Sequence, residues 1–336
     1  MDERNMTCPV CGHARAGEEL RCSNCQFPQA FVTCFAGERS HGFWERKVRA
    51  ARRAWSDRRL PLLSAPGAFT LDWKEASFLD TERHVLTRFR AGGEPVRMEQ
   101  VQQYSPGSHH AVLLHTDGTV EAWGDNDYGQ CAVKDLKDIT YVAAGPQCTL
   151  AVEKNGRVHV RGSCACRTQV ESWEGIRVVA CGSYHVVGLR ENGQVRFAGG
   201  PLAPAVFRSA SPMMAFPVTS VAAATDCALF LHKNGTVTFA GRAGDPRSGA
   251  SKWEDIQAVA VDGQYAVGLT RDGRVLLAGE HHTLLSAGRV RAEEWTDLAA
   301  IACGGSCIGG ITRSGELRLA GSMQGADLLR AAWDRI

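Results

Sequence analysis

The sequence has no long hydrophobic run, no strong net charge and no apolar leader. Its most apolar stretch, residues 218–231, is broken by polar side chains and falls short of the roughly 18–20 apolar residues that cross a bilayer. Its 38 basic residues nearly match its 36 acidic ones, which argues against a general nucleic-acid coat or a membrane-surface binder. Because charged residues begin the chain and no apolar core follows them, we expect a cytoplasmic protein without a secretion signal or membrane contact.

The motifs of several enzyme classes are also missing. The sequence has no GxxxxGK followed by Ser or Thr, no HExxH, no GxSxG, and no GxGxxG between a predicted strand and helix. The adjacent pairs His109–His110 and His281–His282 would point to opposite faces of a strand, which makes them poor shared metal ligands. We therefore predict that the protein is not an enzyme and has no small-molecule substrate.

Cysteine is abundant, and four of the 13 cysteines form two Cys-x-x-Cys pairs near the N-terminus. Each pair can present two thiolates to one metal ion, and two pairs complete a tetrahedral site. The sequence therefore predicts a zinc ribbon over residues 1–36 that binds one structural zinc ion through Cys8, Cys11, Cys22 and Cys25. The segment resembles the short zinc ribbons at the start of many bacterial and archaeal proteins. The remaining cysteines lie mostly in apolar runs, where a reduced cysteine behaves as a small hydrophobe.

From about residue 98 the sequence repeats with a period near 40 residues. Each repeat has two apolar runs joined at a glycine that follows Asp, Asn or Ser: Gly118, Gly156, Gly193, Gly235, Gly273 and Gly315. Such a pair is a strong hairpin signal, because both central residues of a type I′ turn adopt positive φ. A period near 40 in an all-β pattern indicates a β-propeller.

The repeat has the form Val-Ala-x-Gly-x-x-His-x-x-x-Leu-x-x-Asp-Gly-x-Val-x-x-x-Gly, and residues 178–199 and 259–279 are its most legible copies. This pattern resembles the repeat of the regulator of chromosome condensation family, and segment 124–131 is most like the bacterial branch of that family. The resemblance implies a mainly β protein with a propeller over residues 66–336. Such propellers usually have seven blades. Six are readable here, and residues 66–97 fit a degenerate seventh, so we expect seven blades rather than six.

A spacer that begins with tryptophan recurs between repeats: Trp173, Trp253, Trp295 and Trp333. We expect these tryptophans to pack between blades rather than to form a stacking platform. We expect the last spacer, residues 333–336, to close the ring against the first readable blade near residues 101–114, because closure removes exposed sheet edges.

One repeat position, eight residues before the turn glycine, is rich in histidine and cysteine: His110, Cys148, His185, Cys227, Tyr265 and Cys307. A metal channel is the tempting interpretation. However, equivalent positions lie on different blades, too far apart to share an ion with bonds of about 2.0–2.3 Å. The family resemblance implies that this position serves blade packing.

A basic helical linker is predicted over residues 37–65, between the ribbon and the propeller. Trp44, Val48, Ala51 and Trp55 form one apolar stripe of a helix over residues 38–59. This segment has eight basic and three acidic residues, a local net charge of +5, and its main basic side chains are Arg46, Lys47, Arg49, Arg52, Arg53, Arg58 and Arg59. Two interpretations stay open: a basic surface for nucleic acid or an acidic protein, and a solvated face of a helix that packs on the propeller.

The repeats differ most in the segments that follow the glycine at the end of each unit: residues 163–172, 200–217, 242–252, 280–294 and 322–332. We expect these segments to gather on one face of the propeller and to carry its function. The candidate contact residues are Phe207, Met213, Met214 and Phe216 in the longest segment, and His281 and His282 in another. Proline-stiffened apolar loops suit protein recognition, because they lose little entropy on binding.

The sequence thus predicts a non-enzymatic interaction protein that binds a protein partner through the loops of its propeller, with the ribbon and basic helix as accessory elements. A nucleic-acid adaptor that uses the ribbon and residues 38–59 is one alternative. The family resemblance adds a second, a guanine-nucleotide exchange factor for a small GTPase, and a third, a protein inhibitor of an enzyme. The family's Gly-x-Asn-x-x-Gly-Gln segment occurs once, at residues 124–130, which argues against exchange activity.

Overall fold

The computed structural model describes residues 6–7, 14–15, 69–71, 75–90, 95–200, 216–279, 291–304 and 307–321. The chain divides into two compact units, Met1–Pro61 with Arg313–Glu316 and Leu62–Thr312 with Leu317–Ile336. In the first unit, β1 (Met6–Thr7) and β2 (Ala14–Arg15) form an antiparallel pair that flanks Cys8 and Cys11 in sequence. The predicted zinc ligands and the predicted helix over residues 38–59 lie outside the described residues.

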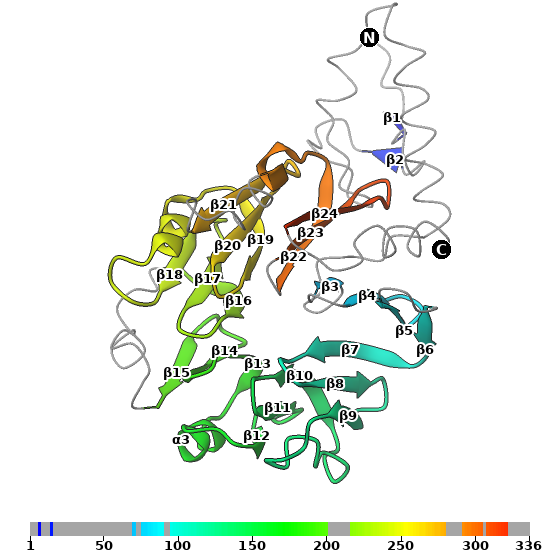
Figure 1. The fold of residues 1–336 in the computed structure, drawn as a ribbon, viewed down its shortest axis with the longest axis vertical. Coiled ribbons are helices and arrows are strands. Elements are labelled where there is room, and N and C mark those ends of the chain that lie inside the picture. Colours follow the sequence, from blue (N-terminus) through cyan, green and yellow to red (C-terminus); the bar gives the residue numbers. More distant parts are fainter. Residues whose placement is uncertain are drawn as a thin grey trace, which may run out of the picture. The chain divides into compact units, whose positions relative to one another are not determined.

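The described part of the second unit forms seven antiparallel sheets, which we number as blades in chain order (Figure 1). Blade 1 has four strands and each of the others has three. Blades 1 to 4 consist of β3 (Phe69–Leu71), β4 (Glu75–Asp80), β5 (Val85–Arg90) and β6 (Val96–Met98); β7 (Val101–Pro106), β8 (His110–His115) and β9 (Val120–Gly124); β10 (Ile139–Ala144), β11 (Cys148–Glu153) and β12 (Val158–Gly162); and β13 (Ile176–Cys181), β14 (His185–Arg190) and β15 (Val195–Gly199). Blades 5 to 7 consist of β16 (Val218–Ala223), β17 (Ala228–His232) and β18 (Val237–Ala240); β19 (Ile256–Val261), β20 (Tyr265–Thr270) and β21 (Val275–Gly279); and β22 (Leu298–Gly304), β23 (Cys307–Thr312) and β24 (Leu317–Gly321). Three short helices join some of these blades: α3 (Arg167–Glu171), η2 (Pro246–Lys252) and η3 (Arg291–Glu294).

The hydrophobic core lies between neighbouring blades rather than within any one of them. The cluster between blades 3 and 4, for example, joins Leu150 and Val160 of one sheet to Val179 and Val186 of the next. Because blades 2 to 7 are covered on both faces, their middle strands are buried along nearly their whole length, and every residue of β20 and β23 is buried. This explains why the middle strands are continuous apolar runs in the sequence.

A backbone hydrogen bond at five of the turn glycines locks one blade to the next. The Gly156 carbonyl accepts from the N–H of Ile176, which starts the following blade, at 3.0 Å, and the Gly118 carbonyl accepts from Ile139 at the same distance. Gly193, Gly235 and Gly273 make the equivalent bond. Gly156 has φ of +83°, and a Cβ there would lie 2.7 Å from the Cα of Gly175. The glycine is therefore required both by its backbone conformation and by the close approach of the next blade.

Blade 1 confirms the prediction of seven blades, although its turn has no glycine. His84 stands where the other blades have their turn glycine, with φ of +57°, and its carbonyl accepts from the N–H of Val101 at 2.8 Å. The first strand of this blade packs against β22 and β23 of blade 7. A Cβ at Gly309 would lie 2.9 Å from the Phe69 ring, so these two blades meet closely. Residues 333–336, which we expected to close the ring, lie outside the described residues.

Three of the four spacer tryptophans pack between blades, and Trp333 lies outside the described residues. Trp173 and Trp253 are buried, and each ring lies over a glycine of the middle strand that follows it, Gly188 or Gly268. Trp295 packs against the cluster between blades 6 and 7. In the described part of the chain, no helix is both long and apolar enough to span a bilayer.

Candidate functional site

The third strand of a blade ends at the same edge of the propeller as the loop between its first two strands. Backbone hydrogen bonds fix this arrangement: the N–H of Asp125 donates to the carbonyl of His109, that of Ser163 to Gln147, and that of Gly200 to Tyr184, at 2.9–3.0 Å. We call this edge the loop face and the residues between one blade's third strand and the next blade's first strand the exit segment. The loop face includes loops 107–109, 145–147, 182–184, 224–226 and 262–264 and the start of each exit segment. The turn glycines lie at the opposite edge, because neighbouring strands are antiparallel.

Between blades 2 and 3 the exit segment holds a neutral polar network. Gln130 is fully buried, and its side-chain oxygen accepts from the N–H of Tyr128 at 2.9 Å. The Thr149 hydroxyl donates to the Gln130 carbonyl at 2.8 Å and lies 2.9 Å from Nε2 of His110. Burial lowers the pKa of His110, so its ring is neutral at pH 7. The segment that resembles the family motif therefore packs this junction.

Between blades 5 and 6 the same location holds an ion cluster. Arg247 of η2 is only 5% exposed, and its guanidinium donates to Asp226 at 2.7 Å and to Asp245 at 2.6 Å. It also donates to the carbonyl of Asp262 in the next blade, at 2.9 Å. Burial alone would raise the pKa of Asp245, but the Arg247 hydrogen bonds and charge lower it below its usual range. Arg247 thus joins the two blades by hydrogen bonds to the carboxylates of Asp226 and Asp245 and to the carbonyl of Asp262.

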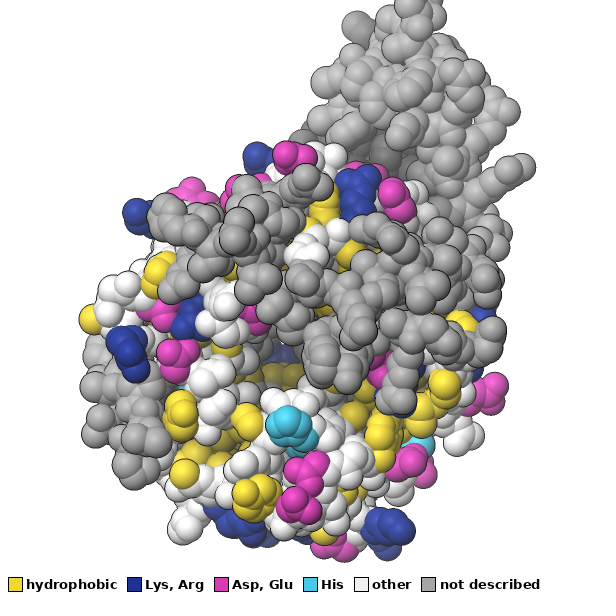
Figure 2. Space-filling view, viewed as in Figure 1, with side chains coloured by type: hydrophobic (Ala, Val, Ile, Leu, Met, Phe, Trp, Pro, Cys, Tyr) yellow, Lys and Arg dark blue, Asp and Glu magenta, His cyan; other side chains and the backbone are white. Residues whose placement is uncertain are grey.

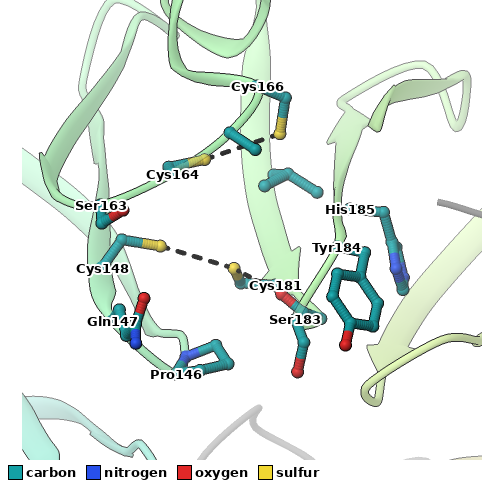
Figure 3. Close-up of a pocket in the computed structure, with 13 residues that line it drawn as sticks. Pro146, Gln147, Cys148, Ser163, Cys164, Cys166, Cys181, Ser183, Tyr184 and His185 are labelled. Atoms are coloured by element: carbon teal, nitrogen blue, oxygen red, sulfur yellow. Dashed lines mark hydrogen bonds between the residues drawn. The ribbon is translucent and has the colours of Figure 1, made fainter. Parts of the chain in front are cut away.

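Between blades 3 and 4 the location holds four thiols, which we call the thiol pocket: Cys148, Cys164, Cys166 and Cys181. They surround a cavity of about 130 Å³ that is also lined by the exposed residues Gln147, Ser183 and Tyr184 (Figure 3). The Sγ atoms of Cys148 and Cys181 are 3.7 Å apart, and those of Cys164 and Cys166 are 3.6 Å apart. The His185 ring points away from the sulfur atoms, toward blade 5.

Hydrogen bonds among Cys148, Cys164 and Cys166 shift the acidity of these three thiols. Donation from Cys148 and Cys166 lowers the pKa of Cys164, and the nearby charge of Arg167 acts in the same direction. The same bonds raise the pKa of Cys148 and Cys166, together with their burial. Cys164 is therefore the most acidic of the three.

Of the six predicted contact residues, the described structure contains only Phe216. It is 51% exposed, but it lies at the turn edge rather than on the loop face, because it comes just before Val218, whose N–H donates to the carbonyl of the turn glycine Gly193. The Phe216 carbonyl contacts Nδ1 of His232 at 3.0 Å. Phe207, Met213, Met214, His281 and His282 lie outside the described residues, as do the predicted basic residues from Arg46 to Arg59.

Two exposed aromatic residues on the loop face escaped the sequence analysis. Tyr128 is 54% exposed in the exit segment of blade 2, and Tyr184 is 40% exposed in the first loop of blade 4. The thiol pocket was missed as well, since its cysteines come from three separate segments. Among the described residues no group of three or more His, Cys, Asp or Glu side chains is arranged to hold a metal ion.

Comparison with known proteins identifies the architecture. A sequence model of the regulator of chromosome condensation (RCC1) repeat matches residues 105–130. The ectodomain of the receptor kinase ACR4 from Arabidopsis thaliana is 15% identical, with a TM-score of 0.58 over 76% of this chain and 94% of that chain. Human WBSCR16 is 16% identical, with a TM-score of 0.56 over 72% and 81%. Prp20p from Saccharomyces cerevisiae is 13% identical, with a TM-score of 0.52 over 80% and 84%. The described blades therefore form an RCC1-type β-propeller.

Proposed function

We propose that this protein is a non-enzymatic interaction protein that binds a protein partner through the loop face of its propeller. The observation that carries the proposal is that the blade backbone is constant whereas the exit segments vary in sequence. The same backbone hydrogen bonds recur from blade to blade, whereas the exit segments carry unrelated side chains at one edge. Prp20p, which has the same fold, was studied for its binding to Gsp1p and histones, and this supports a protein partner here.

The chemistry of the loop face favours a protein over a nucleic acid. The exposed Tyr128 follows two acidic residues, Asp125 and Asp127, which would repel phosphate groups. In Figure 2 the described side chains of both charge signs are mixed with hydrophobic ones on the face shown. Exposed tyrosines on a mixed polar surface are typical anchors of protein interfaces, because they bury a large area at little entropic cost.

The N-terminal unit has an accessory role in this proposal. A zinc ion bound by Cys8, Cys11, Cys22 and Cys25 would hold the ribbon together, and the pairing of β1 with β2 around the first Cys-x-x-Cys supports such a knuckle. The basic segment over residues 38–59 would add electrostatic attraction to the partner. Substitution of Arg49, Arg52 and Arg53 by Glu should then weaken binding mainly at low ionic strength.

Site-specific photo-crosslinking tests the proposed face although the partner is unidentified. A photo-reactive phenylalanine derivative at position 128 or 184 should cross-link a specific protein in native lysate, and nuclease treatment should not abolish the product. The same residue at position 216 is the matched control, since Phe216 is equally exposed but lies at the turn edge. Once the captured protein is identified, Tyr128→Ser with Tyr184→Ser should weaken binding at least about tenfold, while Phe216→Ser should not. Cross-linking from position 216 alone, or a product that disappears with nuclease, would overturn the proposal.

A further inference from the structure

The thiol pocket has a composition that packing alone does not explain. Cys227 occupies the same repeat position in blade 5 as Cys148 in blade 3, and burial raises its pKa to about 12. Its charged neighbours include Arg247 and Asp226, so it is a single buried thiol without sulfur partners of the kind that Cys148 has. A cysteine at this repeat position is therefore compatible with the blade without other cysteines around it. In the part of the chain that the structure describes, four thiols line one opening at the junction of blades 3 and 4.

The sulfurs contact one another in two pairs, Cys148 with Cys181 and Cys164 with Cys166. No group of three or more His, Cys, Asp or Glu side chains among the described residues is arranged to hold a metal ion. Pairs of sulfurs at 3.6–3.7 Å are in van der Waals contact, and a disulfide bond of about 2.05 Å requires only that they close the remaining gap.

The pocket is open to a small reagent. Cys164 and Cys181 are only partly buried, and the surrounding Gln147, Ser163 and Ser183 are exposed. A cavity of about 130 Å³ is several times the roughly 30 Å³ that a water molecule occupies, so a peroxide of similar size fits. Oxidation of cysteine requires a thiolate with access to solvent, and Cys164 meets both conditions.

We propose that the thiol pocket is a site of reversible oxidation by hydrogen peroxide, at which Cys164 is attacked and Cys166 then closes a disulfide bond with it. In the first step the Cys164 thiolate displaces hydroxide from the peroxide, and with one proton this yields Cys164 sulfenic acid and water. In the second step the Cys166 sulfur attacks the Cys164 sulfur, the S–O bond breaks, and the thiol proton leaves with the hydroxyl group as a second water. Two thiols are thus oxidised to one disulfide while one peroxide is reduced to two waters, and a thiol reductant reverses the change.

The site is independent of the proposed partner, and its test needs only the purified full chain. The reduced protein is treated with hydrogen peroxide and a sulfenic-acid trap, and the modified peptides are mapped by mass spectrometry. We expect a disulfide between Cys164 and Cys166 in the unaltered protein, formed at least about tenfold faster than any modification of Cys227, and its loss after dithiothreitol. In Cys166→Ser we expect trapped sulfenic acid at Cys164, and in Cys164→Ser neither product.

Two further measurements separate this proposal from its rivals. Alkylation of Cys164 should change little between pH 7.5 and 5.5, whereas an ordinary thiol slows about 100-fold over that interval. Cys227→Ser is the matched control and should leave oxidation of Cys164 unchanged. Thermal unfolding and circular dichroism of each variant show that it is folded. No disulfide in the pocket, first attack at another of its cysteines, or a metal ion retained by Cys8→Ser but lost in Cys164→Ser would overturn the proposal.

Discussion

Two junctions of the propeller, between blades 5 and 6 and between blades 3 and 4, are packed at equivalent places by side chains of opposite chemistry. Between blades 5 and 6, an almost fully buried guanidinium is held by Asp226, Asp245 and a carbonyl of the next blade. Between blades 3 and 4, four thiols fill the corresponding space and leave an open cavity. The first junction depends on full pairing of charges, since a buried charge without its partner is costly. The second contains weakly polar groups that tolerate a gap.

This difference shows which parts of the repeat are constrained. The backbone bond from each turn residue to the next blade holds the sheets at a fixed spacing, whatever the exit segment contains. An exit segment therefore only has to satisfy its own polar groups. A propeller of this kind can carry an amide network, an ion cluster or a reactive thiol group at equivalent places without a change in fold.

The largest effect should come from removal of the buried charge. Arg247→Ala leaves Asp245, whose side chain is 8% exposed, without its main partner. We expect the free energy of unfolding to fall by about 3 kcal/mol, because breaking one side of a buried ion pair costs more than the pair contributes. Cys148→Ala in the other junction removes a buried sulfur and one of two hydrogen-bond donors to Cys164, but Cys164 is only partly buried, so the loss should be about 1 to 2 kcal/mol. Urea unfolding at pH 7 measures both.

Arg242→Ala is the matched control for the ion cluster, because Arg242 lies nearer the surface and precedes the same helix. It should change stability by less than about 0.5 kcal/mol. If Arg247→Ala and Cys148→Ala lower the free energy of unfolding equally, the two junctions do not differ in how far they depend on paired charges.

A pH-dependent effect of similar size should arise at His185, which faces the junction of blades 4 and 5. Burial lowers the pKa of His185 to about 4, against the opposing influence of Asp226 and a hydrogen bond with the backbone of Cys227. The unfolded chain, with an ordinary histidine pKa near 6.5, then binds the proton more readily than the folded chain between pH 6.5 and 4. Stability should therefore fall as the pH is lowered through this window, by about 3 kcal/mol in total from this group.

The measurement is the free energy of unfolding at pH 7 and pH 4.5 for the unaltered protein, His185→Gln and His109→Gln. The first substitution keeps a polar side chain without the titration and should remove most of the pH slope that His185 contributes. The second alters an exposed histidine of another blade and is the control for the substitution itself. Identical slopes in all three proteins would show that His185 does not titrate as its burial requires.

The sequence predicted the parts of the fold that depend on local chemistry. The Asp-Gly and Asn-Gly pairs correctly predicted where the turns lie, but only the glycine of each pair has positive φ, so the turns are not of type I′ as expected. Trp173 and Trp253 are buried between blades as their repeat position predicted. Blade 1 was harder to predict from the sequence, because His84 adopts the turn conformation without the glycine that marks the turn in the other blades.

The candidate site was less predictable, because its members meet only through blade packing. Cys148, Cys164 and Cys181 belong to a middle strand, an exit segment and a first strand, and nothing in their spacing places them together. Phe216 was predicted to share one face with other loop residues. It lies at the turn edge because an exit segment must cross the blade to start the next first strand.

The smallest effect is expected at the turn of blade 1, where His84 replaces the turn glycine. Comparing it with Gly156 tests whether blade 1 is held in the propeller by the same contacts as the other blades. Gly156→Ala forces a side chain into φ of +83° with its Cβ 2.7 Å from the backbone of the next blade, and should cost about 1 to 3 kcal/mol. His84→Gly relieves the positive φ of an exposed histidine, while the added glycine makes the unfolded chain more flexible. These contributions oppose each other at about 1 kcal/mol each, so the net change should stay within about 0.5 kcal/mol. Urea unfolding of both variants decides the matter. If His84→Gly is destabilised as strongly as Gly156→Ala, the His84 side chain itself supports the turn, and blade 1 is held by contacts that the other blades do not need.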